Sequence, residues 1–299
     1  MLLSTQTSII AQRFGVEGAL RCIAKAGFDC FDMTFLELRE DDEQRVYSDE
    51  YMEFAQELKK LMNELHISCN QAHAHIPSET EDEEYNKDSY WRICREMEFA
   101  AILGAKVIII HANHVSDYKE EEFDYNVKFY NQFIPCCKQF GIKVAVENGY
   151  LIDEHQKYVK HIVPTYLSFS EDMAEFYDRL DSRYFTVCLD LGHSTLLGEE
   201  PQKAIRVLGS ERLHALHIQD NDYYRDGHLI PYLGNICWDE VCKALADINY
   251  DGEFTFETHH FLDNFPNDFY DEAVGFMGKV GRYLVRKVET YKKNNGSRI

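Results

Sequence analysis

Apolar positions along the chain repeat with two different periods. In the segment 54–65 they recur every three or four positions, as on one face of a helix, at Phe54, Leu58, Leu61 and Leu65. Two further runs repeat this spacing, at Tyr90, Cys94, Met97 and Ala101 and at Tyr130, Phe133, Cys137 and Phe140. Between such runs lie short stretches rich in Val, Ile and Phe, which are typical of strands. Alternating strands and helices predict a parallel sheet with crossover helices.

Glycines mark many of the boundaries between these elements. The sequences LGAKVIIIHAN and FGIKVAVENGY each place a Gly at the end of a helical run, with a β-rich run directly after it. Glycine ends helices because it adopts the left-handed conformation without steric cost. A last helix is expected over Asp268–Lys292, followed by a polar, frayed tail. The eight predicted strands are Leu2–Thr5, Cys30–Thr34, Ser68–His75, Lys106–His111, Lys143–Asn148, Phe185–Asp190, Leu213–Gln219 and Glu253–His259.

Small and large residues alternate beneath the polar groups that end these strands. Side chains of a strand point to opposite faces in turn, so the residue two positions earlier shares a face with each end group. For Glu147, Asp190, His217 and Glu257 these neighbours are the small residues Ala145, Cys188, Ala215 and Thr255. The residues directly before the four groups are large and apolar: Val146, Leu189, Leu216 and Phe256. Small side chains inside and bulky ones outside are what a closed barrel requires.

The same four strand ends distinguish a barrel from an open sheet. In an open, doubly wound sheet, four successive strand tips spread along about 14 Å, because neighbouring strands lie ~4.8 Å apart. A closed barrel turns the tips towards a common axis, where one metal ion reaches all of them. We therefore predict an α/β fold that is a single (β/α)8 barrel, with residues 1–299 forming one domain.

The ligand types at this end of the barrel indicate a hard divalent cation. Two glutamates, one aspartate and one histidine suit Mn, Co, Mg or Zn. A single acidic residue at a strand end is more often a solvated loop residue, and a single histidine in an apolar strand is more often part of the core. The prediction therefore rests on four strands that all direct such a residue to the same face. We expect one divalent metal ion, bound by Glu147, Asp190, His217 and Glu257.

The composition of the chain limits the cellular compartment and the binding partners that we expect. Apolar residues make up 45% of the 299 positions, enough for a sizeable core, and no long apolar run or secretory signal is apparent. Nine cysteines without a CxxC pair favour reduced thiols in the cytoplasm. Thirty-one basic and fifty-two acidic residues give a formal charge of −21, which opposes binding to nucleic acid or anionic lipid. A homo-oligomer is compatible with the sequence.

Four strand-end motifs carry a family resemblance. VAVEN, LDLGHS, HALHIQDND and FTFET resemble the metal-bearing strand ends of the xylose isomerase-like TIM barrels. That superfamily includes ketose 3-epimerases, hydroxypyruvate isomerases, inosose dehydratases and three-zinc apurinic endonucleases. The resemblance spans the third to the eighth strand and implies the metal ligands named above. It also implies that His193 lies beside the metal or contacts substrate.

Further residues resemble additional ligands of the endonuclease branch. Asp226 and His228, spaced D-x-H, resemble a pair that binds an extra zinc there, and His111 with either His73 or His75 falls where that branch has ligands. The residues expected to bind either substrate or additional metal are His75, His111, His193, Asp226 and His228.

Three classes of reaction are compatible with the resemblance and the chemistry. An isomerase or epimerase of a small sugar removes a proton next to a carbonyl through an enediolate, with Glu147 and Glu257 as acid/base groups. The alternatives are a dehydratase or lyase on the same scaffold, or a three-metal phosphodiesterase. The net charge of −21 disfavours the phosphodiesterase. Arg225 is the basic residue close to the site motifs, which slightly favours an unphosphorylated sugar.

Overall fold

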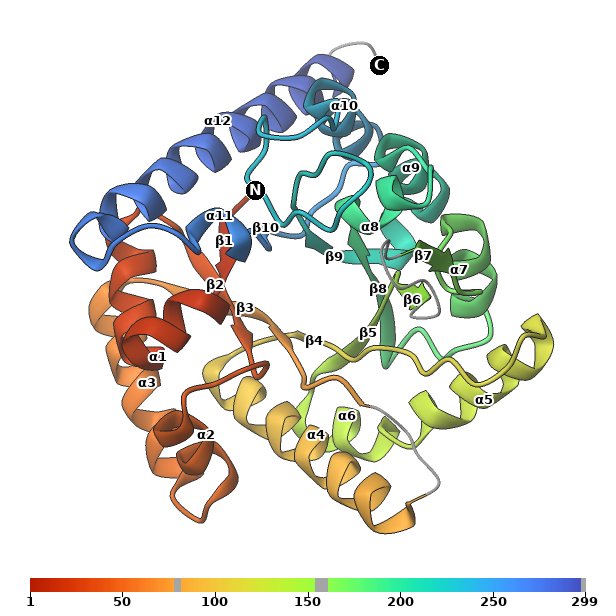
Figure 1. Cartoon of the computed structure of the whole chain (residues 1–299), viewed down its shortest axis with the longest axis horizontal. Helices are drawn as coiled ribbons and strands as arrows, with labels where there is room; N and C mark the ends of the chain where they lie inside the picture. The colour runs from red at the N-terminus through yellow and green to blue at the C-terminus, as the bar shows by residue number, and fades with distance from the viewer. Residues whose placement is uncertain (78–81, 154–160, 297–299) are drawn as a thin grey trace.

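Eight parallel strands form a barrel surrounded by a ring of helices (Figure 1). The computed structural model describes residues 1–77, 82–153 and 161–296. The strands follow the order β10-β1-β2-β3-β4-β5-β8-β9. A parallel bridge between Ile218 and Phe256 joins the two ends of this order, so the sheet closes on itself. The strands are β1 (Leu3–Gln6), β2 (Cys30–Thr34), β3 (Ser68–His73), β4 (Val107–Ile109), β5 (Lys143–Glu147), β8 (Phe185–Asp190), β9 (Leu213–His217) and β10 (Phe254–Phe256).

The helices lie outside the strands, and most connect one strand to the next. Each of the eight predicted strands overlaps one observed strand, so the predicted barrel is confirmed. The helices are α1 (Ser8–Lys25), α2 (Glu40–Tyr47), α3 (Tyr51–Leu65), α4 (Glu83–Leu103), α5 (Lys119–Asn131), α6 (Ile134–Phe140), α7 (Ser170–Tyr177), α8 (Leu191–Leu196), α9 (Pro201–Arg212), α10 (Trp238–Asp247), α11 (His259–Leu262), the 3₁₀ helix η1 (Asn267–Phe269) and α12 (Tyr270–Gly296).

Two separate apolar layers follow from strand alternation. Inside the barrel, a small cluster packs around the axis; its members are Val107, Ile109, Ala145, Cys188 and Ala215. The intervening large residues belong instead to the main core between strands and helices, as predicted; they are Val146, Leu189, Leu216 and Phe256. The interior below the strand ends is therefore filled with side chains and is not a channel.

Three local features differ from the sequence prediction. The helical run expected from Tyr130 to Phe140 divides into α5 and α6, where Pro135 occupies the first turn of α6. Proline has no N–H to donate and fits a first turn better than a helix interior. An antiparallel hairpin, β6 (Tyr150–Asp153) with β7 (His161–Pro164), follows β5 and was not predicted. The last helix extends to Gly296, and residues 297–299 of the expected tail lie outside the described residues.

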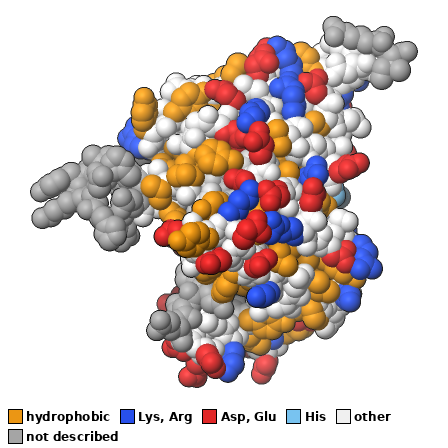
Figure 2. All heavy atoms as spheres, turned by 90° about the vertical axis from the view of Figure 1, so that its right-hand side faces the viewer, with side chains coloured by type: hydrophobic (Ala, Val, Ile, Leu, Met, Phe, Trp, Pro, Cys, Tyr) orange, Lys and Arg blue, Asp and Glu red, His pale blue; other side chains and the backbone are white. Residues whose placement is uncertain are grey.

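Charges of both signs alternate on the outer surface. Figure 2 shows basic and acidic side chains interspersed on the face that carries α5 and α7. There Arg179 lies 2.9 Å from Glu120 and 3.0 Å from Glu175. Such exposed pairs contribute little stability each. Among the described residues, none of the helices combines the length and apolar character needed to cross a bilayer.

Candidate metal centre

The carboxyl ends of β5, β8, β9 and β10 bring four ionisable side chains to the inside of the barrel mouth. Glu147, Asp190, His217 and Glu257 are all buried, with at most 7% of their surface exposed. His217 Nδ1 lies 2.5 Å from Glu147 Oε1 and 3.3 Å from Glu257 Oε2, so both carboxylates converge on the same imidazole nitrogen. Asp190 caps α8 by accepting the His193 N–H at 2.7 Å. We call these four residues the central cluster; their role as metal ligands stays a prediction.

Side chains from β1, β2 and β3 hold the central cluster in place. Asp32 Oδ2 lies 3.2 Å from His217 Nε2 and accepts a hydrogen bond from Gln71. Gln6 donates to Glu257 Oε1 at 2.9 Å. A carboxylate bound to the distal nitrogen of an imidazole fixes the tautomer and orientation of a metal-binding histidine. Asp32 and Gln6 were not predicted as site residues, although both are polar residues in or directly after the first two predicted strands.

A second group of ligand-type atoms lies beside the central cluster on the β3–β5 side. His73 and His111 direct their Nε2 atoms to within 3.1 Å of each other. Glu147 Oε2 is 2.9 Å from His111 Nε2 and 3.5 Å from His73 Nε2. Donor atoms of these three residues lie close enough together to hold one ion. Glu147 therefore belongs to both groups.

A third group forms where the loop after β9 folds over the mouth. Asp226 Oδ2 lies 3.0 Å from His228 Nε2 and 3.5 Å from His193 Nε2. Tyr150 donates a hydrogen bond to the same carboxylate at 2.8 Å, and Gln219 donates to Asp226 Oδ1 at 2.7 Å. His193, Asp226 and His228 also form a group with metal-ligand spacing.

His75 does not share the position that the sequence analysis favoured for it. Strand β3 ends at His73, two residues before His75. His75 Nδ1 lies 2.9 Å from the buried carboxylate of Glu96, and His75 Nε2 lies 3.0 Å from the Ser89 hydroxyl. His73, and not the predicted His75, lies beside His111.

Burial and mutual charge shift the protonation of the central cluster. Burial raises the pKa of Asp190 to about 7, and the neighbouring Glu257 and Glu147 add to this. Burial also opposes ionisation of Glu147 and Glu257. Even so, the charge of His217 holds the pKa of Glu147 well below its usual value and that of Glu257 at about 2. Burial lowers the pKa of His217, but the charges of Glu147 and Glu257 raise it well above its usual range.

These shifts describe a site that needs positive charge. Protonated imidazoles balance the buried carboxylates, and a dication takes over that role only when the ligands release their protons. Glu147 Oε2 and Glu257 Oε2 are buried and accept no hydrogen bond from the described residues, although imidazole nitrogens lie 2.9 and 3.3 Å away. Free lone pairs on buried carboxylates, with imidazole beside them, fit a hard divalent cation.

Fold and site together define a (β/α)8 barrel with a candidate metal centre at the carboxyl ends of its strands. The family model described as "Xylose isomerase-like TIM barrel" matches residues 20–280, and the chain belongs to this family.

Curated relatives match shorter segments of the chain. Protein y4fM of Sinorhizobium fredii is 30% identical over 54% of this chain and 50% of its own length. Protein MJ1311 of Methanocaldococcus jannaschii is 27% identical over 56% and 55%. A D-psicose 3-epimerase of Enterocloster bolteae is 32% identical over 30% and 28%. The chain thus spans about half the length of the first two relatives, and 28% of the length of the third.

Solved structures match along almost the whole chain. An L-ribulose 3-epimerase superposes with a TM-score of 0.74 at 15% identity, covering 99% of this chain and 97% of that chain. A D-psicose 3-epimerase from Clostridium cellulolyticum H10, solved with D-tagatose, gives 0.71 at 17% identity, covering 95% and 99%. An IOLI protein with a bound zinc atom gives 0.72 at 16% identity, covering 97% and 99%. At these identities the likeness establishes the shared fold.

Proposed function

We propose that this chain is a divalent-metal-dependent isomerase or epimerase of a small sugar. One observation carries the proposal: the buried carboxylates of Glu147 and Glu257 converge on the same nitrogen of the His217 imidazole at the barrel mouth. Glu147, Asp190, His217 and Glu257 would hold the cation, and these ligand types suit Mn, Co, Mg or Zn. The D-psicose and L-ribulose 3-epimerases among the similar proteins support a sugar as substrate.

The proposed chemistry is transfer of a proton at the carbon next to a carbonyl. A dication held by the central cluster would supply the positive charge that makes the proton next to the carbonyl more acidic. Glu147 and Glu257 approach from β5 and β10, which are not neighbours in the barrel. One carboxylate takes the proton, and the other returns a proton from the opposite side. Asp32 and Gln6 keep the His217 ring and the Glu257 carboxylate in fixed orientations.

The test is product analysis with defined metal content. The protein is freed of metal, loaded separately with Mn, Co, Mg or Zn, and incubated with D-psicose, D-tagatose and L-ribulose. We expect at least one metal to restore formation of an isomer of equal mass. A product lighter by one water would indicate the dehydratase or lyase alternative. Activity that is unchanged in the metal-free protein would contradict the proposal.

A second candidate is a three-metal phosphodiesterase, which one observation favours. The groups His73–His111–Glu147 and His193–Asp226–His228 both assemble beside the central cluster. The formal charge of −21 argues against it, because binding of duplex DNA depends on neutralising phosphates. Arg225 is highly exposed and pairs with Asp222, so its charge is already balanced. We expect no nicking of DNA at abasic sites; three zinc ions per chain together with salt-sensitive nicking would favour this candidate.

We also propose that residues 1–299 act as one domain in the cytoplasm, with a homo-oligomer as the possible assembly. These proposals rest on the continuous barrel pattern and the expected reduced thiols. Sedimentation of the purified protein measures the oligomeric state.

A further inference from the structure

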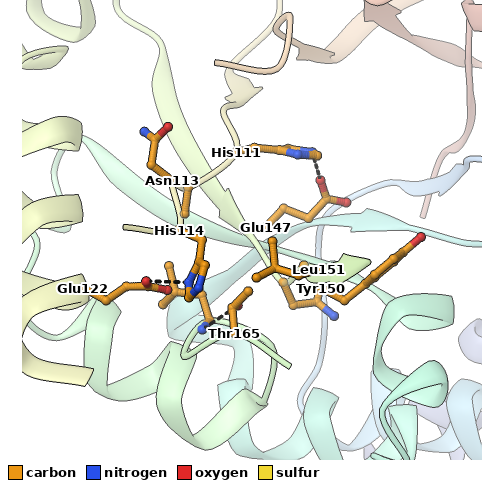
Figure 3. A pocket seen from close by; sticks show the side chains of 12 residues that line it. His111, Asn113, His114, Glu122, Glu147, Tyr150, Leu151 and Thr165 are labelled. Carbon is orange, nitrogen blue, oxygen red and sulfur yellow. Dashed lines mark hydrogen bonds and ion pairs between the residues drawn. The ribbon is translucent and has the colours of Figure 1, made fainter. Parts of the chain in front are cut away.

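A pocket of about 110 Å³ opens beside the central cluster, between the loop after β4 and the hairpin after β5. His111 and Glu147 form its inner end, and His114, Leu151 and Thr165 line it farther out. Figure 3 shows these side chains around one hollow, with His114 directed towards Glu122. A molecule that reaches the central cluster through this pocket therefore passes His114.

The His114 ring is held by a buried carboxylate. Its Nδ1 atom lies 2.7 Å from Glu122 Oε2, and the Glu122 side chain is only 1% exposed. The same Glu122 oxygen accepts the Val115 N–H at 3.2 Å. Asn126 anchors the loop by accepting the Asn113 N–H and donating to the Asn113 carbonyl. Such support fixes a ring for recognition rather than leaving it free to rotate.

The other ring nitrogen of His114 is available to a ligand. The side chain is 31% exposed. Within residues 1–77, 82–153 and 161–296, no other group engages Nε2. An imidazole nitrogen donates or accepts one hydrogen bond according to its protonation, and so matches a hydroxyl group in either case.

The remaining wall excludes strongly anionic ligands. The described lining includes the carboxylates of Glu122 and Glu147 and the apolar side chains of Leu151 and Leu167, without Lys or Arg. A phosphate dianion is usually bound by Arg, Lys or a helix N-terminus. Any charge on His114 is already compensated by Glu122. The pocket therefore suits a neutral chain that carries hydroxyls on one side and C–H groups on the other.

We propose that His114, held by Glu122, binds the terminal hydroxyl of an unphosphorylated sugar whose carbonyl end lies at the central cluster. This inference rests on the proposed function, because it assigns the far end of the same substrate. His114 selects the substrate and takes no part in the proton transfer. Loss of Nε2 consequently weakens substrate binding more than it slows turnover.

The test combines a change in the protein with a matching change in the sugar. His114→Phe keeps a planar ring and removes the polar nitrogens, and Tyr118→Phe, on a 70% exposed residue of the same loop, serves as the matched control. Binding of D-psicose and D-tagatose to the metal-loaded full chain is measured by calorimetry, and turnover is measured in parallel. For the sugar with the higher affinity, the analogue lacking the terminal hydroxyl and the terminal phosphate ester are compared.

We expect His114→Phe to weaken binding of the parent sugar about tenfold or more, as for loss of one buried hydrogen bond. The KM rises correspondingly, and kcat changes less. The analogue without the terminal hydroxyl should bind to the wild type and to His114→Phe with affinities that agree within about twofold. It lacks the group that His114 would contact, so the substitution removes nothing further. Glu122→Gln gives an intermediate loss, and Tyr118→Phe gives none.

Three results would overturn the inference. The first is that His114→Phe loses the same affinity for the parent sugar as for the analogue without the hydroxyl. The second is that the phosphate ester binds more tightly than the free sugar. The third is that neither sugar binds to the wild type. If the sugars bind in a His114-dependent manner but are not converted, the subsite stands and the proposed isomerase activity fails. Metal content measured in every variant separates loss of substrate contact from loss of the cation.

Discussion

The interior of the barrel changes its chemistry completely within two residues along each of three strands. The lower layer contains Ala145, Cys188 and Ala215, which are small and pack with two aliphatic residues of β4. The upper layer, two positions later on β5, β8 and β9, contains carboxylates and an imidazole that are equally buried. Both layers have the same backbone geometry, because residues i and i+2 share a face. The side chains alone make one layer a packing core and the other a candidate reaction site.

The comparison teaches how stability and function divide in this fold. The lower layer gains free energy by excluding water from apolar atoms. The upper layer places several charges in the same low-polarity interior, which is costly unless they are paired or bind a cation. It is sustained by neighbours such as Asp32 and Gln219, which contact His217 and Asp226. Local departure from the rule of apolar interiors is expected where a protein binds or reacts.

The largest expected effect concerns the acid/base role of the upper layer. Glu147→Gln and Glu257→Gln keep the size of the side chain and remove the base, so each lowers turnover by ~100-fold or more. Turnover is measured on the sugar identified with the wild type, together with metal content. Glu64→Gln, on the exposed end of α3, is the matched control. A fully metallated Glu257→Gln protein with normal turnover would exclude this role.

The next effect concerns the support of His217. Asp32→Asn removes the carboxylate that lies 3.2 Å from His217 Nε2, and we expect metal affinity to fall by ~10- to 100-fold. Competitive titration with a chelating dye measures this affinity. Asp41→Asn, at an exposed position on α2, provides the comparison. An unchanged affinity in Asp32→Asn would mean that His217 does not need this contact or does not bind metal.

The lower layer should respond in stability rather than in metal binding. Ala145→Leu adds volume to a filled interior and should lower the free energy of unfolding by ~1–3 kcal/mol. Urea denaturation of the metal-free protein isolates this effect from any bound cation. If the variant is as stable as the wild type, the interior has spare space and the description of a packed lower layer is wrong.

The smallest effect concerns the group formed by His193, Asp226 and His228. The double variant Asp226→Asn with His228→Asn should raise KM about tenfold and leave the principal metal bound, because neither residue belongs to the central cluster. Elemental analysis counts the metal ions per chain before and after the change. Loss of one ion from a chain that originally held several would assign this group to metal instead of substrate.

Much of the fold could be predicted from the sequence, because a barrel repeats one pattern eight times. The alternation of side chains along a strand was enough to predict that Glu147 and His217 point into the barrel, because the small residues Ala145 and Ala215 lie two positions earlier on the same face. The β6–β7 hairpin was missed, since it is an insertion outside the repeating pattern. Sequence patterns also gave no means of locating its path over the pocket.

The choice between His73 and His75 could not be made from the sequence. Both residues have the same parity, and the decision depends on where the strand stops. Strand β3 ends at His73, and the buried Glu96 on α4 then binds the His75 ring and backbone. The His114–Glu122 contact was equally hidden, because it depends on how α5 packs after β4 and not on any period within the sequence.

Exchange of substrate hydrogen with solvent tests the central claim most directly. The metal-loaded protein is incubated with the accepted sugar in D₂O, and the carbon next to the carbonyl is followed by proton NMR. Proton transfer through Glu147 and Glu257 predicts that deuterium enters at this carbon in the wild type, with exchange slowed ~100-fold or more in Glu257→Gln. Conversion of the sugar without any solvent deuterium at that carbon would contradict the account.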